Sequence, residues 1–143
     1  MLIVKQVSYN SSDYQEMLNL RNEVLRKPLG LQLDISKLGN EDSDYLIAGF
    51  EDEIMVGCLI LSPQNATIVK LRQMAVKEVF QGHGFGRQIV AWAEAFAVNL
   101  GFASMEMHAR KYAVPFYSKQ GYECFGDEFL EVGIPHLRMK KFL

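Results

Sequence analysis

The chain has 143 residues, and at roughly 150 residues per domain this length predicts one domain with a core of its own. Apolar residues make up 49% of the sequence and charged residues 22%, which excludes an intrinsically disordered chain. The 15 basic and 17 acidic residues give a net charge of -2, so we expect no nucleic-acid or membrane partner, and an anionic ligand needs a local binding device.

The amino-terminal part of the chain predicts a strand and then a helix. Residues 2–7 have the pattern of a short strand, Ser12 and Gln15 have the spacing of a capping box, and apolar residues then recur at helical intervals. We expect a helix of about four turns that ends before Pro28. Residues 28–44 contain Pro, Gly, Asn and Asp, which favours a loop or a short irregular helix that frames a ligand-binding mouth.

The middle of the chain predicts an antiparallel meander. Two apolar runs, residues 45–50 and 54–61, flank the acidic turn at 51–53. A second turn at 62–65 leads into the long run 66–76, which adds a third strand.

A helix and then a strand follow the meander. From Gly86 onward apolar residues mark one helical face, and Gly101 stands where a glycine ends a helix. Residues 104–108 alternate between apolar and polar side chains, as in a strand. A short helix and two strands complete the expected order, over residues 114–119, 122–132 and 137–142.

This order of elements favours an α+β or mixed α/β fold. Helices should pack on a mostly antiparallel sheet, in which only the central strand-helix-strand unit need be parallel. No linker or repeat interrupts the sequence, so residues 1–143 are expected to form a single domain.

The two cysteines, Cys58 and Cys124, indicate neither a zinc site nor a disulfide framework, because neither has CxxC spacing or a nearby paired histidine. No apolar run approaches the roughly 18 residues of a membrane span, and the amino end does not resemble a signal peptide. We therefore expect a cytoplasmic protein without a metal site.

The most informative segment is the glycine loop at residues 81–87, between the long strand and the second long helix. Glycines at a helix amino terminus let a phosphate approach unpaired backbone N–H groups and the positive end of the helix dipole. A Walker A loop is excluded because no Lys-Ser or Lys-Thr follows the glycines. A dinucleotide loop needs G-x-G-x-x-G where this segment reads G-x-G-x-G, although Glu106 has the spacing of a ribose-binding acid. A tight turn without any ligand is the remaining alternative.

Two motifs in this order resemble those of the GNAT superfamily of N-acetyltransferases. Gln81, Gly84 and Gly86 fill the pattern [Q/R]-x-x-G-x-[G/A] of the acetyl-CoA pyrophosphate loop, and the segment 113–122 resembles the downstream A-x-x-F-Y-x-x-x-G-[F/Y] motif. The segment 133–136 is also similar to some bacterial members. The resemblance implies a GNAT-like fold with helices on both faces of the sheet, and acetyl-CoA as the acetyl donor.

The resemblance also implies which residues bind this donor. The backbone of Met74, Ala75 and Val76 would pair with the pantetheine arm, as an added strand does at a sheet edge. The pyrophosphate would bind the loop amides, with Arg87 and Lys77 near the phosphates; the loop residues are Gln81, Gly82, His83, Gly84, Phe85, Gly86 and Arg87. Many members carry an Asn after the next strand, but this chain has none there, and we expect Arg110 and Lys111 to be solvated charges.

Acetyl transfer to an amine needs a base, because an alkyl ammonium has a pKa of about 10. Glu106, His108, Glu131 and His136 are the candidates, and we place Glu106 and His136 in the predicted catalytic set. Glu106 and His108 should share one face of their strand. An exposed polar strand face, and a structural hydrogen bond for His136, are the alternatives.

Tyr117 is the predicted general acid for the leaving thiolate, because the pKa of a phenol lies near that of a thiol. The resemblance places the general acid at the same tyrosine. A backbone N–H near Met74 or Ala75 would hold the oxyanion. An acyl-cysteine route is disfavoured because both cysteines lie in apolar strand patterns without a basic neighbour.

We therefore predict an acetyl-CoA-dependent N-acetyltransferase that acts on a primary amine by direct attack. The amine can belong to a small molecule, a peptide or a protein, and residues 28–44 and 131–136 are expected to shape its pocket. A noncatalytic acyl-CoA-binding module and a dinucleotide-binding oxidoreductase remain alternatives, and a homodimer remains open.

Overall fold

The computed structural model describes residues 1–34, 38–39 and 41–143. The described strands form one sheet in the order β1-β2-β3-β4-β5-β7-β6, in which β4 and β5 are the parallel pair. The strands are β1 (Ile3–Val7), β2 (Tyr45–Glu51), β3 (Ile54–Pro63), β4 (Ile68–Val76), β5 (Ser104–Arg110), β6 (Glu123–Glu131) and β7 (Ile134–Phe142). The expected mixed fold, with one parallel strand-helix-strand unit, is confirmed.

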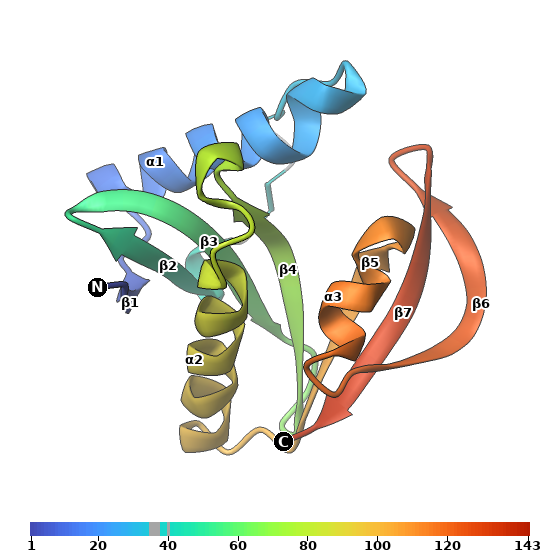
Figure 1. Ribbon diagram of the computed structural model, residues 1–143. Coiled ribbons are helices and arrows are strands. Elements are labelled where there is room, and N and C mark those ends of the chain that lie inside the picture. Colours follow the sequence, from blue (N-terminus) through green and yellow to red (C-terminus); the bar gives the residue numbers. More distant parts are fainter. Residues whose placement is uncertain (35–37, 40) are drawn as a thin grey trace.

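Helices cover both faces of this sheet (Figure 1). The α-helices are α1 (Ser12–Arg21), α2 (Phe85–Asn99) and α3 (Val114–Ser118). A π-helical stretch, η1 (Asn22–Arg26), continues α1, and short 3-10 turns are η2 (Lys27–Leu29), η4 (Glu41–Ser43), η5 (Glu78–Phe80) and η6 (Lys111–Ala113).

Each face of the sheet has its own buried core. On one face α1 packs Met17 and Leu18 against apolar residues of β2 and β3, while α2 packs Ile89 and Ala93 on the opposite face. The side chains of β3 are buried on both faces between its two ends, which explains why the run 54–61 is apolar without alternation. Burial of these faces is the main stabilising contribution to the fold.

The first helix differs from the expectation in its capping residue and in the geometry of its last turn. Ser11, not Ser12, is the capping residue, and its side-chain oxygen accepts a hydrogen bond of 3.2 Å from the Tyr14 amide. The α-helical geometry stops at Arg21, and the chain continues as η1 and then η2 through Pro28. Pro28 is tolerated because it stands in the first turn of η2, where an amide hydrogen would lack a partner. The α-helix and its π-helical continuation thus end at Arg26, before Pro28 as expected, and only the separate turn η2 contains the proline.

The last hairpin is tighter than expected. Strand β7 begins at Ile134 rather than at 137, because Val132 and Gly133 form a two-residue turn with positive φ angles of 45° and 76°. Within residues 28–44 the chain forms η4 and part of η2, and the expectation for residues 35–37 and 40 lies outside the described residues.

A bulge in β4 opens the sheet and positions the site. Gln73 has a positive φ of 55°, and the register with β3 shifts beside it. Leu71 faces the α2 side before the bulge, whereas Ala75 faces the α1 side after it. The parallel pairing of β4 with β5 runs only to Leu71 and Met107, and the two halves of the sheet part toward the top of Figure 1.

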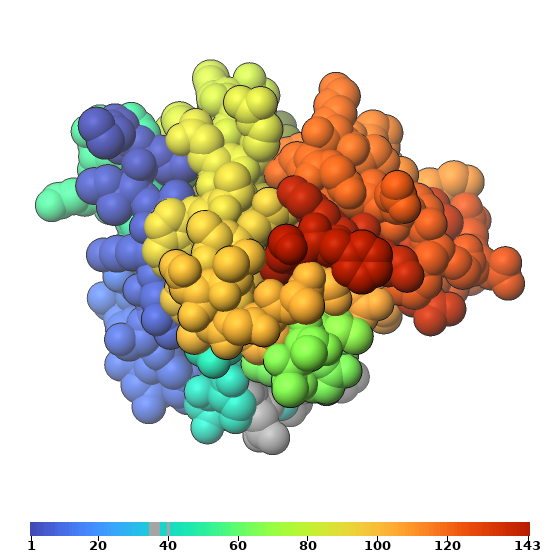
Figure 2. All heavy atoms as spheres, turned by 90° about the horizontal axis from the view of Figure 1, so that it is seen from below, coloured from blue at the N-terminus to red at the C-terminus, as the bar shows by residue number. Residues whose placement is uncertain are grey.

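The opposite end of the sheet is closed. The Leu143 amide donates to the Ala103 carbonyl at 2.9 Å, and the Ala103 amide donates to the Thr67 carbonyl at 2.8 Å. Figure 2 shows this end filled by the carboxyl-terminal residues, the end of α2 and the turn between β3 and β4. Ligand access is therefore from the open end, where the strands part.

Candidate active site

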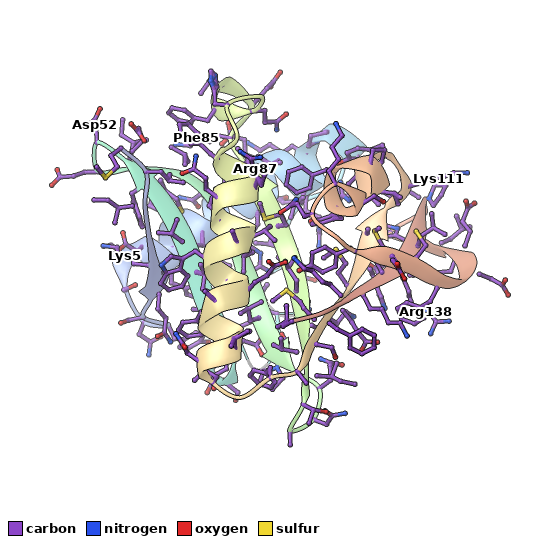
Figure 3. All side chains as sticks on the ribbon, turned by 60° about the horizontal axis from the view of Figure 1, so that its bottom comes forward. Lys5, Asp52, Phe85, Arg87, Lys111 and Arg138 are labelled. Carbon is purple, nitrogen blue, oxygen red and sulfur yellow. The ribbon has the colours of Figure 1, made fainter. Side chains whose placement is uncertain are left out.

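The amino terminus of α2 is left open by its own side chains. Gly84 caps the helix in the left-handed conformation, with φ 80°, and no side chain caps the first amides, in contrast to Ser11 at α1. The first hydrogen bond within the helix runs from the Gln88 amide to the Gly84 carbonyl, so the amides of residues 85–87 have no intrahelical partner. Figure 3 shows Phe85 and Arg87 at this end of α2. Such a terminus favours an anion.

A hollow of about 580 Å³, the larger hollow, lies between this helix end and α3. Nine of the ten predicted donor-binding residues line it: Met74, Ala75, Val76, Gln81, Gly82, Gly84, Phe85, Gly86 and Arg87. His83 and Lys77 do not line it, and the His83 ring stacks on Phe85 instead. Lys119, which the sequence did not point to, is a further lining cation, and no carboxylate is found among the described residues that line this hollow.

The glycine loop packs closely against the end of β4 and against α3, at Val76 and Gly86. The Gln81 side chain donates a 2.9 Å hydrogen bond to the Val76 carbonyl, which ties the loop to the end of β4. A Cβ atom at Gly86 would lie 3.2 Å from the Phe116 ring and 3.4 Å from the Val76 side chain. A Cβ atom at position 86 would therefore require the neighbouring side chains to shift by a few tenths of an ångström.

A second hollow of about 130 Å³, the smaller hollow, lies on the other side of the parted strands. It is lined by residues of η1, β4, β5 and the β6–β7 hairpin, among them Arg26, Arg72, Gln73, His108, Arg110, Glu131 and His136. The two hollows share Leu25, Met74, Tyr112, Ala113 and Tyr117. The structure thus brings Tyr117 and Met74 to the boundary between the hollows.

Tyr117 is buried, with 6% of its surface exposed, and it packs edge-on against Phe116 and Tyr122. No hydrogen bond of its hydroxyl is found among the described residues. Burial, together with the nearby Tyr112 phenol, raises the pKa of Tyr117 well above that of a free phenol. The phenol is therefore protonated at neutral pH and is able to donate.

Glu131 joins two histidines at the edge of the smaller hollow. Its Oε1 lies 3.0 Å from Nδ1 of His108, and its Oε2 lies 3.5 Å from Nε2 of the buried His136. His136 Nδ1 lies 2.9 Å from the Ile134 carbonyl oxygen, so both of its ring nitrogens have partners. Burial alone would raise the pKa of Glu131, but the hydrogen bond from His108 and the charges of both histidines lower it.

One predicted candidate base, Glu106, lies elsewhere, and so do both cysteines. Glu106 shares the face of β5 with His108, as expected, but it lines a separate depression beside Lys70 and Arg138 and neither of the two hollows. Burial raises the pKa of the Cys58 thiol to about 12, and Cys124 is exposed on β6 outside both hollows. The geometry therefore gives no support to Glu106 as the base or to an acyl-cysteine.

Arg110 differs from the expectation that its charge is solvated. It is half-buried rather than solvated, and its Nη2 donates to the Leu25 carbonyl at 2.9 Å. Lys111 is exposed and paired with Glu128, as a solvated charge should be. No local pattern could separate these neighbours, because the partner of Arg110 lies 85 positions away.

Comparison with known proteins identifies the family. The profile of the acetyltransferase (GNAT) domain matches residues 22–143, a stretch that includes every lining residue named above. The chain belongs to the GNAT family of acetyltransferases. A Bacillus subtilis relative named uncharacterized N-acetyltransferase YjcF is 28% identical over 138 residues, which span 94% of this chain and 96% of the relative. This GNAT chain is thus an enzyme of the N-acetyltransferase class.

Solved structures of low sequence identity share the GNAT fold. A candidate N-acetyltransferase from Lactobacillus plantarum has a TM-score of 0.89 at 24% identity, covering 99% of this chain and 98% of that one. A GNAT family acetyltransferase from Elizabethkingia anophelis, with acetyl-CoA bound, has a TM-score of 0.77 at 16% identity, with the same coverage of both chains. None of the helices in the described part of this chain is long and apolar enough to cross a membrane.

Proposed function

We propose that this enzyme transfers the acetyl group of acetyl-CoA to a primary amine by direct attack, with the donor in the larger hollow and the amine in the smaller one. The observation that carries the proposal is that the two hollows meet at Tyr117 and Met74, where a thioester and an amine can react. The acetyl-CoA bound to the Elizabethkingia anophelis structure supports the choice of donor.

The donor is held mainly by backbone groups. Beyond Leu71 the edge of β4 is no longer paired with β5 and is open to the amides of the pantetheine arm, although the Val76 carbonyl already accepts from Gln81. The pyrophosphate oxygens accept hydrogen bonds from the open amides at residues 85–87, and Arg87 and Lys119 add positive charge. This arrangement needs no basic surface, which agrees with the net charge of -2.

The chemistry assigns one role to each group. The amine nitrogen attacks the thioester carbon, a C–N bond forms, and the carbonyl oxygen becomes an oxyanion that a backbone N–H beside the β4 bulge stabilises. The C–S bond then breaks, and the leaving thiolate takes the proton of the Tyr117 hydroxyl. The proton lost by the amine passes to a base in the smaller hollow, and solvent returns both groups to their starting protonation states.

We propose His108 as that base, in place of His136 and Glu106. Nδ1 of His108 contacts Glu131 at 3.0 Å, closer than the 3.4 Å to Lys70 Nζ. With Nδ1–H donated to the carboxylate, Nε2 carries the free lone pair, and Glu131 stabilises the imidazolium that forms. His136 has partners at both nitrogens, so its role is to position Glu131.

Substitution of the two histidines separates these roles. With a general base in the mechanism, kcat of the parent enzyme should rise with pH. His108→Gln should lower kcat roughly a hundredfold or more and remove this pH dependence, because the base is lost. His136→Gln should keep that pH dependence and change kcat less. If His136→Gln alone abolished the pH dependence, the assignment of His108 would fail.

Thiol release in the presence of acetyl-CoA and a library of primary amines tests the proposed function. Release of free CoA that depends on the amine, with the acetylated amine found by mass spectrometry, is the expected result. Binding of acetyl-CoA without release with any amine would favour the noncatalytic acyl-CoA-binding module. Stabilisation by NAD but not by acetyl-CoA would favour the oxidoreductase. Cytoplasmic location, the absence of a metal and a homodimer stay predictions, and light scattering measures the last.

A further inference from the structure

The smaller hollow carries more positive charge than acetyl transfer to a simple amine requires. Among the described residues that line it are three guanidinium groups, those of Arg26, Arg72 and Arg110, and one carboxylate, that of Glu131. A protonated amine would be repelled by such a lining. This excess positive charge points to the kind of acceptor that binds here, an inference that rests on the proposed function of this hollow as the acceptor site.

Two of these charged groups already have partners. Arg72 is paired with Asp44 at 3.5 Å and donates to the Ser62 hydroxyl at 3.2 Å. Glu131 is bound to His108 and His136. These contacts leave Arg26 and Arg110 as the cations to be explained.

Arg26 and Arg110 converge on one neutral oxygen. Nη2 of Arg110 donates to the Leu25 carbonyl at 2.9 Å, and Nη1 of Arg26 donates to the same carbonyl at 3.3 Å. Neither guanidinium takes part in an ion pair found among the described residues. Residues 35–37 and 40 are Ile, Ser, Lys and Asn, so they supply no carboxylate.

This arrangement is electrostatically incomplete. Both side chains are half-buried, and burial, then the charges of Arg110 and Arg21, lower the pKa of Arg26, which the Glu131 carboxylate only partly opposes. An oxyanion between the two guanidiniums would offset their repulsion, and the planar fork of an arginine matches the geometry of a carboxylate or a phosphate. Arg26 comes from the end of η1 and Arg110 from the end of β5, so the fold brings them together from distant parts of the chain.

We propose that the acceptor of this enzyme is a small amine that also carries an oxyanion, a carboxylate or a phosphate group, which Arg26 and Arg110 bind while the amino group reaches His108 and the Tyr117 boundary. The volume of about 130 Å³ suits a small molecule rather than a folded protein surface.

Matched amines test this substrate class. The value of kcat/KM is measured for ω-amino acids of increasing chain length, for their ω-amino amides and for ω-aminoalkyl phosphates of the same lengths. At the optimum length we expect an oxyanion to raise kcat/KM about tenfold to a hundredfold over the amide, the size of one or two charge-assisted hydrogen bonds. A preference for the acid over the phosphate, or the reverse, identifies the group.

Variants connect the preference to the two arginines. Arg110→Gln and Arg26→Gln should each reduce the oxyanion preference, the ratio of kcat/KM for the acid to kcat/KM for the matched amide, by about tenfold. Arg110→Lys should keep part of the preference, because it keeps the charge. Lys111→Gln removes the adjacent exposed charge and is the matched control, which should keep the full preference.

A binding measurement keeps this inference separate from the proposed function. Calorimetry with 4-aminobutanoate and its amide, on the protein without acetyl-CoA, should show tighter binding of the acid in the parent protein but not in Arg110→Gln. Equal kcat/KM and equal binding of acids and amides would overturn the inference and leave acetyl transfer standing. Arginine-dependent binding of the acid without turnover of any amine would keep the oxyanion site and overturn the proposed function.

Discussion

The two hollows of this acetyltransferase are built in different ways. The larger hollow is lined mostly by one stretch of chain, residues 74–87, together with η6 and α3, and this stretch includes the open amides of α2. The smaller hollow is lined by η1, β4, β5, η6, α3 and the β6–β7 hairpin, and most of the charged side chains lie here. A ligand common to a family can be bound by backbone that any sequence with the right glycines provides. A ligand that differs between members needs side chains, and these are brought together only by the complete fold.

The largest expected effect is at the boundary of the two hollows. Tyr117→Phe removes the proposed acid and should lower kcat roughly a hundredfold to ten-thousandfold, with the dissociation constant of acetyl-CoA little changed. Steady-state kinetics and calorimetry measure the two quantities. Tyr9→Phe, on the α1 side of the molecule, is the control and should leave both unchanged. Full turnover by Tyr117→Phe would remove this residue from the mechanism.

A buried ion pair joins the end of α1 to η4, next to the η1 segment that lines the smaller hollow. Arg21 donates to the two carboxylate oxygens of Glu41 at 2.8 and 3.0 Å, and Tyr14 donates to the same carboxylate at 2.6 Å. Glu41→Ala leaves a buried guanidinium without its partner, which should reduce the free energy of unfolding by about 3 to 5 kcal/mol. Glu128→Ala breaks an exposed pair and should cost at most about 1 kcal/mol. Urea denaturation of both variants checks the difference.

The same ion pair predicts that part of the free energy of unfolding is lost at acidic pH. Burial alone would raise the pKa of Glu41, but hydrogen bonds from Arg21 and Tyr14 and the Arg21 charge leave it lowered. A lowered pKa in the folded state stabilises the protein above the unfolded-state value of about 4.3, and this contribution is lost as the pH falls through the folded-state pKa. The stability difference between parent and Glu41→Ala should therefore be constant near neutral pH and shrink below about pH 4. A difference that grew on acidification would contradict the assignment.

The smallest effect separates the donor loop from ordinary helix ends. Gly84 and Gly101 both have positive φ angles, 80° and 93°, and open space around the missing Cβ. Alanine at either position should reduce stability by a similar amount, about 1 kcal/mol, through backbone strain. Only Gly84→Ala should also weaken acetyl-CoA binding, because only it lines the larger hollow. Equal acetyl-CoA affinities of the two variants would argue against the loop as the phosphate site.

The difference between the hollows also explains what could be predicted from the sequence. The helix end at Gly101 and the loop from Gln81 to Gly86 are encoded by adjacent residues, so their patterns are visible without the fold. The bulge at Gln73 has no glycine or proline to mark it, although it opens the sheet. The contact of Arg110 with Leu25 spans 85 positions, so reading Arg110 locally as a solvated charge was wrong.

Tyr117 and His108 illustrate the same limit within the catalytic set. Tyr117 lies in a motif, and the structure places it at the boundary of the hollows. The sequence offered four candidate bases without a way to choose, because the choice depends on the 3.0 Å contact between His108 on β5 and Glu131 at the end of β6. Pairing across two neighbouring strands brings these residues together, and no local spacing encodes it.

Amide hydrogen exchange in the presence of acetyl-CoA is the most direct test of the central claim, that backbone groups of β4 and α2 bind the donor. The amides of residues 85–87 lack intrahelical partners and should exchange fast in the free protein. Saturating acetyl-CoA should slow exchange there and along residues 72–76, with no change in β6. Unchanged exchange in both segments at millimolar acetyl-CoA, or protection confined to the β6–β7 hairpin, would contradict the account.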